Sequence, residues 1–255
     1  MLFIFTPYGF CFNLNKLQLA YMMAIVRDEK LYIYEKRNSI NPKVTIMKDI
    51  LKENERFVFV DSLVGLEDEF EYIEKKDAII IGKKFTKEEK RKLIRECLQL
   101  NEKTKERLGS IPVYDVAVHC RTGDKITWGE MEKIEIIDYV NEIKKVPDLP
   151  ENPTIFLMTD NGKVVTEFKS LIPTSWKIFT YTKEEIDAYD QHTFNDKTSK
   201  QKIAEIYQFL LEMEIAKASK AFIGTLSSNV GLYIILTGNH IYVKSLDFDT
   251  NIILD

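Results

Sequence analysis

The 255-residue chain has few residues of the kinds that build disulfide frameworks or metal centres. It contains only three cysteines, Cys11, Cys97 and Cys120, an odd number with no metal-ligand spacing. Its three histidines are far apart along the chain, and no paired aspartates indicate a required divalent ion. We therefore expect a protein of a reducing compartment that needs no metal and no cofactor.

Charge of one sign and long apolar runs are also lacking. The formal net charge is −4, with 36 basic and 40 acidic residues, so no electrostatic footprint for nucleic acid is present. No apolar run is long enough to cross a membrane. The apolar residues 1–12 lack a basic segment and a cleavage site, and Pro7 and Gly9 interrupt them. These features predict a soluble, cytoplasmic protein.

The order of apolar and amphipathic segments predicts an α/β protein. In the first part, residues 2–5, 31–34, 57–60 and 78–81 are predicted strands. Asn13 is a plausible cap for the helix between the first two strands, and Thr86 for a long helix over residues 87–108. A strand–helix–strand order of this kind predicts a parallel sheet.

The same alternation begins again after a break at residues 109–112. Strands are predicted at residues 113–119, 154–158, 176–181, 221–224 and 240–243, and helices at 133–145, 164–170, 200–218 and 229–236. We therefore predict two small Rossmann-like domains, 1–110 and 111–255, facing each other across a cleft.

Polar loops follow several of these strands at their carboxyl ends, where open α/β sheets bind ligands. Neither a Walker loop nor a GxGxxG fingerprint is among them. In residues 119–125, Arg121 is a planar bidentate donor suited to a diphosphate, although a solvated loop with an internal Asp–Arg pair is an equal alternative. Gly9 and Phe10 stand before the first predicted helix, where Gly9 could let backbone amides approach a phosphate, so both are candidate binding residues. Alternatively, Gly9 could simply serve a turn.

Two further loops carry groups that could meet a ligand. Residues 224–229, Gly-Thr-Leu-Ser-Ser-Asn, place hydroxyls and amides at a helix start, which suits an anion. Simple helix capping by Ser227 or Ser228 is the alternative. The loop after the strand at 154–158 could place Asp160 at the cleft, although as a turn signal it is ordinary.

Together, these loops resemble four motifs of the GDP-fucose-dependent α1,6-fucosyltransferase and nodulation fucosyltransferase group. The family's glycine loop and apolar helix are echoed from Gly9-Phe10 onward, and its His-Val-Arg-Arg-Thr-Asp-Lys signature by residues 119–125. Its Ala-Thr-Asp-Asp segment resembles residues 158–161, and its Thr-Phe-Ser-Ser-Gln-Val segment residues 225–230. The resemblance implies a GT-B-like fold, reduced to the catalytic core, and a metal-independent inverting glycosyltransferase.

The resemblance also implies roles for individual residues in binding the donor nucleotide. Arg121 would bind the donor diphosphate, and Ser228, at the end of the Thr225–Ser227–Ser228 motif, would face the phosphates. His119 and Glu212 would contact guanine, since a carboxylate can accept from two guanine N–H groups at once.

Catalytic roles are implied for two residues that follow the signature arginine. Lys125 matches a catalytic lysine, and Glu130 matches a catalytic glutamate if one residue is inserted. Glu130, or alternatively Asp160, would act as general base toward a glycan acceptor.

The signature departs from the family at one position of consequence. The family's second arginine is Thr122 here, so one cationic contact is missing. Two other hypotheses therefore remain beside fucose transfer from GDP-fucose. One is a non-catalytic protein that binds a nucleotide or glycan, and the other is a glycosyltransferase that uses another nucleotide-sugar.

Overall fold

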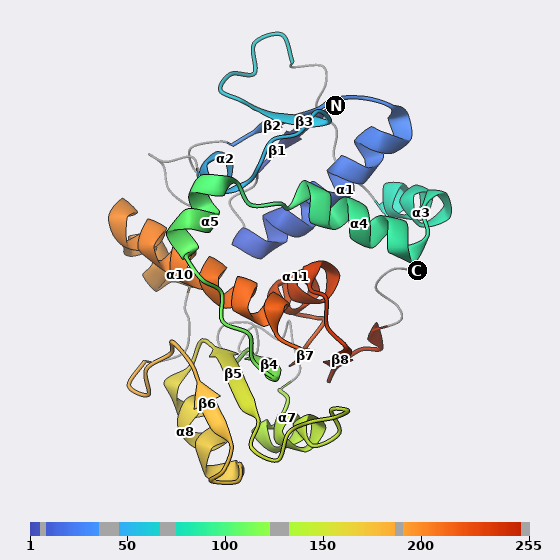
Figure 1. Ribbon diagram of the computed structural model, residues 1–255. Coiled ribbons are helices and arrows are strands. Elements are labelled where there is room, and N and C mark those ends of the chain that lie inside the picture. Colours follow the sequence, from blue (N-terminus) through green and yellow to red (C-terminus); the bar gives the residue numbers. More distant parts are fainter. Residues whose placement is uncertain (6–8, 36–45, 67–74, 123–132, 187–190, 251–255) are drawn as a thin grey trace. The chain divides into compact units, whose positions relative to one another are not determined.

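The computed structural model describes residues 1–5, 9–35, 46–66, 75–122, 133–186 and 191–250 (Figure 1). The chain forms two compact units. Met1–Gly109 and Thr198–Ile203 belong to the first, and Ser110–Lys197 with the described residues from Ala204 on belong to the second.

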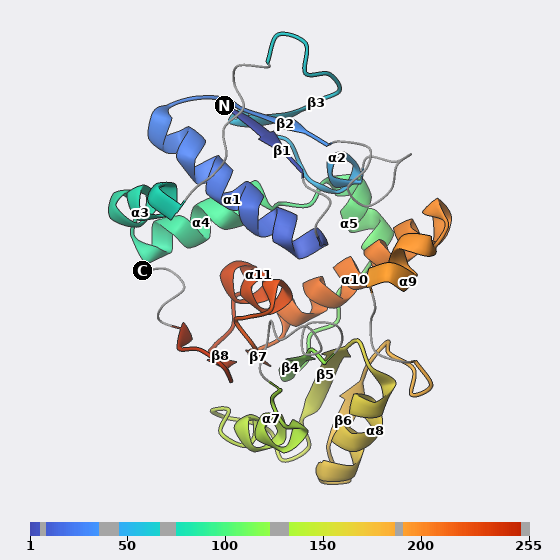
Figure 2. The same cartoon turned by 180° about the vertical axis from the view of Figure 1, so that it is seen from behind.

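The first unit has a parallel three-stranded sheet. The strands β1 (Leu2–Ile4), β2 (Leu31–Tyr34) and β3 (Phe57–Val60) pair in the order β1-β2-β3. Helix α1 (Phe10–Arg27) connects the first two strands and contacts α3 (Lys75–Lys84) and α4 (Lys87–Cys97) on one side of the sheet (Figure 2). The short α2 (Met47–Ile50) and α5 (Glu102–Leu108) complete the described part of this unit.

Three expectations for this unit are wrong. Residues 78–81 lie in helix α3 and not in a strand, and Ile79 and Ile80 are exposed while Ile81 is buried. The predicted helix 87–108 is two helices, α4 and α5. The first residue of α1 is Phe10 with Gly9 as its cap, so Asn13 is an internal, buried residue.

The second unit has a parallel five-stranded sheet in the order β6-β5-β4-β7-β8. The strands are β4 (Val116–Cys120), β5 (Thr154–Thr159), β6 (Lys177–Phe179), β7 (Ala221–Gly224) and β8 (Tyr242–Ser245). The helices of this part of the chain are α7 (Ile136–Ile143), α8 (Gly162–Leu171), α9 (Gln191–Asp196), α10 (Ser199–Ala218) and α11 (Asn229–Thr237).

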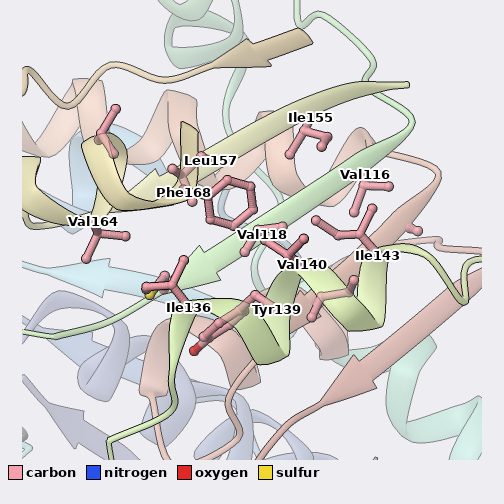
Figure 3. Close-up of a cluster of buried hydrophobic side chains, with 14 of the residues drawn as sticks. Val116, Val118, Ile136, Tyr139, Val140, Ile143, Ile155, Leu157, Val164 and Phe168 are labelled. Carbon is pink, nitrogen blue, oxygen red and sulfur yellow. The ribbon is translucent and has the colours of Figure 1, made fainter. Parts of the chain in front are cut away.

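Helices cover both faces of this sheet, which explains why its central strands are continuous apolar runs. Val116 and Val118 of β4, with Leu157 of β5, point toward α7 and α8 and pack there with Val140 and Phe168 (Figure 3). In both ribbon views α11 and the body of α10 lie on the other side of the sheet (Figures 1 and 2). Ala117 and His119 alternate with the valines and therefore face that side.

One carboxylate ties together the beginnings of three strands. Asp115 accepts hydrogen bonds from the backbone and hydroxyl of Thr154, at 2.9 and 2.8 Å, and from Lys220 Nζ, at 2.7 Å. Burial raises the pKa of Asp115, but the hydrogen bonds from Lys220 and Thr154 outweigh burial and hold the pKa below its ordinary value. This contact fixes the amino ends of β4, β5 and β7, opposite the edge that carries the polar loops.

Candidate functional site

The strand order of the second unit reverses between β4 and β7. From β4 the chain builds outward through β5 to β6, and then returns to place β7 and β8 on the other side of β4. Ligands of open α/β sheets bind at the carboxyl ends of the strands where the order reverses, because the chain connections after the two neighbouring strands run in opposite directions there. The loops in question are the residues after Cys120 and the residues after Gly224.

Arg121 directly follows β4 and is held by Asp160, which follows β5. Arg121 Nη1 lies 3.0 Å from Asp160 Oδ2, and the two side chains are only 17% and 12% exposed. The backbone N–H and the hydroxyl of Thr122 donate to the other oxygen of Asp160, at 3.2 and 3.4 Å. Asn161 Nδ2 donates in turn to the Thr122 hydroxyl, at 3.1 Å.

Asp160 is the common acceptor of this hydrogen-bond network. A carboxylate that receives a guanidinium and two further donors fixes the orientation of these groups. Asp160 therefore holds Arg121 and Thr122 in place, and its role as an alternative general base stays a prediction. Thr122, which stands where the resemblance would have an arginine, is part of the same network.

His119 lies on β4 directly before this network, on the face toward α11. A Cβ added to Gly224 would be 3.6 Å from the Cβ of His119, so the histidine packs beside a position without a side chain. His119 is 4% exposed, and burial first, then the nearby Arg121, lowers its pKa to about 3. The imidazole is thus neutral at physiological pH. Within the described residues, His119 Nδ1 and the fully buried Thr225 Oγ1 have no hydrogen-bond partner.

The loop after β7 is bound by a residue that the sequence did not single out. Asp247 accepts from the backbone N–H groups of Leu226 and Ser227, at 2.8 and 2.9 Å, and from the Ser227 hydroxyl. Ser228 caps α11, because its hydroxyl oxygen accepts from Val230 N at 3.3 Å. Helix capping, one of the two interpretations open from the sequence, is therefore present at Ser228.

Glu212 lies on α10 and is 8% exposed. Burial raises its pKa to about 7, against the opposing effect of Gln208, whose side-chain amide donates to Glu212 at 3.2 Å. A buried carboxyl that titrates near neutrality can bind as an acceptor or as a donor, depending on pH.

The comparisons with known proteins give information on the fold alone. No model of a known protein family matches the chain, and no curated protein matches it. Among solved structures, NodZ alpha-1,6-fucosyltransferase soaked with GDP-fucose aligns over 93% of this chain and 91% of its own, with 13% identity and a TM-score of 0.58. NodZ from Bradyrhizobium aligns over 98% and 94%, with 14% identity and a TM-score of 0.59.

A third structure extends the likeness beyond bacteria. A mutant of Arabidopsis thaliana FUT1 in complex with GDP aligns over 95% of this chain and 69% of its own, with 12% identity and a TM-score of 0.56. The chain has a fucosyltransferase-like fold. The α/β, GT-B-like fold expected from the motifs is confirmed.

Four of the predicted site residues do not belong to the described part of the second unit. Gly9 and Phe10 belong to the first unit, where Gly9 caps α1 and an added Cβ would meet no atom within 4 Å. Lys125 and Glu130 lie outside the described residues. Their assigned roles stay predictions.

Among the described residues, no group of three or more His, Cys, Asp or Glu side chains could hold a metal ion. No helix in the described part of the chain is both long and apolar enough to span a membrane.

Proposed function

We propose that the protein is a glycosyltransferase that moves a sugar from a GDP-sugar, with fucose as the proposed sugar, to a glycan acceptor. The observation that carries this proposal is Arg121, fixed by Asp160 at the point where the strand order of the second sheet reverses. A partly buried, pre-oriented guanidinium in this place suits a diphosphate, whose oxygens it can bind in pairs.

In the proposed reaction the acceptor hydroxyl attacks the anomeric carbon while GDP leaves. The chain's own groups would stabilise the charge that develops on the diphosphate: Arg121, the Ser228 hydroxyl and the amino end of α11. The reaction as proposed requires no metal ion. Lys125 and Glu130 keep the catalytic roles implied by the resemblance, with Glu130 as general base toward the acceptor.

For the nucleobase we propose His119 and Glu212. A neutral His119 can hydrogen-bond to a guanine edge without placing a charge in a dry site. Glu212 in its ionised form could accept from two guanine N–H groups, which uracil does not offer in the same pattern. A glycosyltransferase for another nucleotide-sugar is the alternative, and the choice of base separates the two.

Thr122 favours a second candidate function, a non-catalytic protein that binds a nucleotide or a glycan. The position that resembles the family's second arginine holds a neutral hydroxyl bonded to Asp160 and Asn161. One positive charge fewer at the diphosphate weakens stabilisation of the leaving group more than it weakens ground-state binding.

Replacing Arg121 tests the proposal. We expect Arg121→Ala to lower turnover of GDP-fucose, measured as GDP release with a panel of glycan acceptors, by at least about a hundredfold. Arg121→Lys should be intermediate, because an ammonium keeps the charge but not the planar fork. The matched control is Arg56→Ala, which removes an arginine that is 40% exposed and paired with Asp28 in the first unit.

Turnover by Arg121→Ala equal to that of the wild type would refute the assignment. Wild-type protein that binds GDP but turns over no GDP-sugar on any acceptor would establish the second candidate.

A further inference from the structure

Asp247, just beyond the last strand of the second sheet, binds the loop on which the proposed diphosphate site depends. Besides the contacts from Leu226 and Ser227, its carboxylate accepts from its neighbour Phe248 N, at 2.9 Å, and from the Ser245 hydroxyl. Ser245 also accepts from Leu226 N, at 3.0 Å. The carboxylate thus joins the loop after β7 to the end of β8.

These contacts change which groups of the loop could serve a donor substrate. The N–H groups of Leu226 and Ser227 already point to an anion, which is the protein's own carboxylate. The Ser227 hydroxyl is used in the same way. A diphosphate bound to those groups would have to replace Asp247, and beside it would meet a like charge. From Leu226 onward, contacts to phosphate therefore begin with Ser228.

Helix α11 holds the same loop as well. A Cβ added to Gly231 of α11 would lie 2.0 Å from the Thr225 carbonyl oxygen, so this helix packs directly on the loop backbone. Because both Asp247 and α11 contact the loop, it has little freedom to change its conformation. Two restraints of this kind pre-organise a site.

We propose that Asp247 is a positioning residue for donor binding, which holds residues 225–228 so that Ser228 and the amino end of α11 face the donor diphosphate. This inference rests on the proposed function. It also implies that Ser227, a donor-binding candidate from the sequence, acts through Asp247 and does not contact the phosphates. The charged form of Asp247 is favoured, since hydrogen bonds from Ser227, Ser245 and Leu226 outweigh its burial and lower its pKa.

The test is GDP affinity, measured by calorimetric titration of the full chain. Asp247→Asn keeps the size of the side chain but turns one acceptor toward the loop into an N–H donor. We expect it to raise the Kd for GDP roughly tenfold, the usual effect of losing hydrogen bonds to a charged group. Asp247→Glu, which keeps the carboxylate, should recover part of the affinity. Asp249→Asn, the same change at an exposed position two residues on, should leave the Kd unchanged.

Ser245→Ala is a second variant for the same measurement of the Kd for GDP, and it leaves the charge of the protein unchanged. It removes one acceptor of Leu226 N and one donor to Asp247, so we expect a smaller rise in Kd in the same direction. Thermal unfolding without GDP shows that each variant is folded before its Kd is compared. For any variant that is not folded, the Ser245→Ala result decides.

Unchanged or tighter GDP binding by folded Asp247→Asn would overturn the inference, and tighter binding would mean that Asp247 competes with the phosphates. These outcomes differ from failure of the proposed function, which would show as wild-type protein that binds no GDP. In that case the inference falls with it.

Discussion

Glu212 is a carboxylic acid in a nearly dry position of helix α10, and its pKa of about 7 is the consequence of burial. The charged form is costly there because one amide, from Gln208, is the only hydrogen-bond donor to it in the described structure. Such a position lowers stability unless a ligand donates hydrogen bonds to the carboxylate and so stabilises its charged form. A base with two adjacent N–H groups would do so.

The protonation of Glu212 predicts how stability depends on pH. Its pKa is raised from 4.5 to about 7, so between these values the folded state keeps a proton that the unfolded state releases, and stability falls as pH rises. Above pH 7 the loss is complete, at about 3 kcal/mol. We therefore expect Glu212→Gln to be more stable than wild type at pH 8 by up to that amount, and equally stable at pH 4.5, in urea unfolding.

The difference between the two proteins is the quantity to compare, because His119 has the opposite effect. Its lowered pKa makes the folded state release a proton that the unfolded state binds, so its contribution falls as pH drops below 6.5. Glu205→Gln, on the surface of the same helix and paired with Lys197, is the control and should show no such pH-dependent gain. An equal stability difference at pH 4.5 and pH 8 would contradict the assignment to Glu212.

Some residues of the site could be predicted from the sequence, and others could not. Arg121 and Asp160 were found because each directly follows a buried strand, and the structure joins them in one ion pair. Asp247 was not found, although Ser245 and Asp247 are polar residues at the carboxyl end of the last strand, the same signal. Its importance depends on β8 lying next to β7, and strand order is not visible in local patterns.

At the scale of elements, the packing of α11 on the loop after β7 has a direct test. In an exposed helix, Gly→Ala usually stabilises by about 1 kcal/mol. In Gly231→Ala the new methyl group would lie 2.0 Å from the Thr225 carbonyl oxygen, so helix or loop must shift. We expect destabilisation of about 1–3 kcal/mol in urea unfolding, together with weaker GDP binding. A stabilised variant with normal GDP affinity would show that this contact is not needed.

The elements that the sequence misassigned were decided by tertiary contacts. Residues 78–81 are apolar enough for a strand, yet short apolar runs do not separate strands from helices. The predicted helix 87–108 is interrupted because residues 100 and 101 bond to residues 50 and 51, at the end of α2. Leu100 forms a β-bridge with Leu51, and Asn101 N donates to the Ile50 carbonyl at 2.9 Å. Asn101 then caps α5 by accepting from Thr104 N.

At the scale of the whole molecule, the alternation of strands and helices was sufficient to predict two parallel-sheet units. All five strands of the second sheet were predicted, because a sheet covered by helices on both faces has continuous apolar strands. The reversal of strand order between β4 and β7 was not predictable from local patterns. It is this reversal that brings Arg121 and the loop at residues 225–228 to neighbouring positions at one edge of the sheet.

The proposal that Arg121 and the loop at residues 225–228 bind a guanine nucleotide is tested most directly by thermal or calorimetric titration with GDP and UDP. We expect GDP to stabilise the protein, by about 2.7 kcal/mol at 100 times its Kd, and UDP to stabilise it much less. Arg121→Ala should abolish the effect, and Glu212→Gln should reduce the preference for GDP over UDP. Stabilisation by UDP but not by GDP, or by neither nucleotide, would contradict the account.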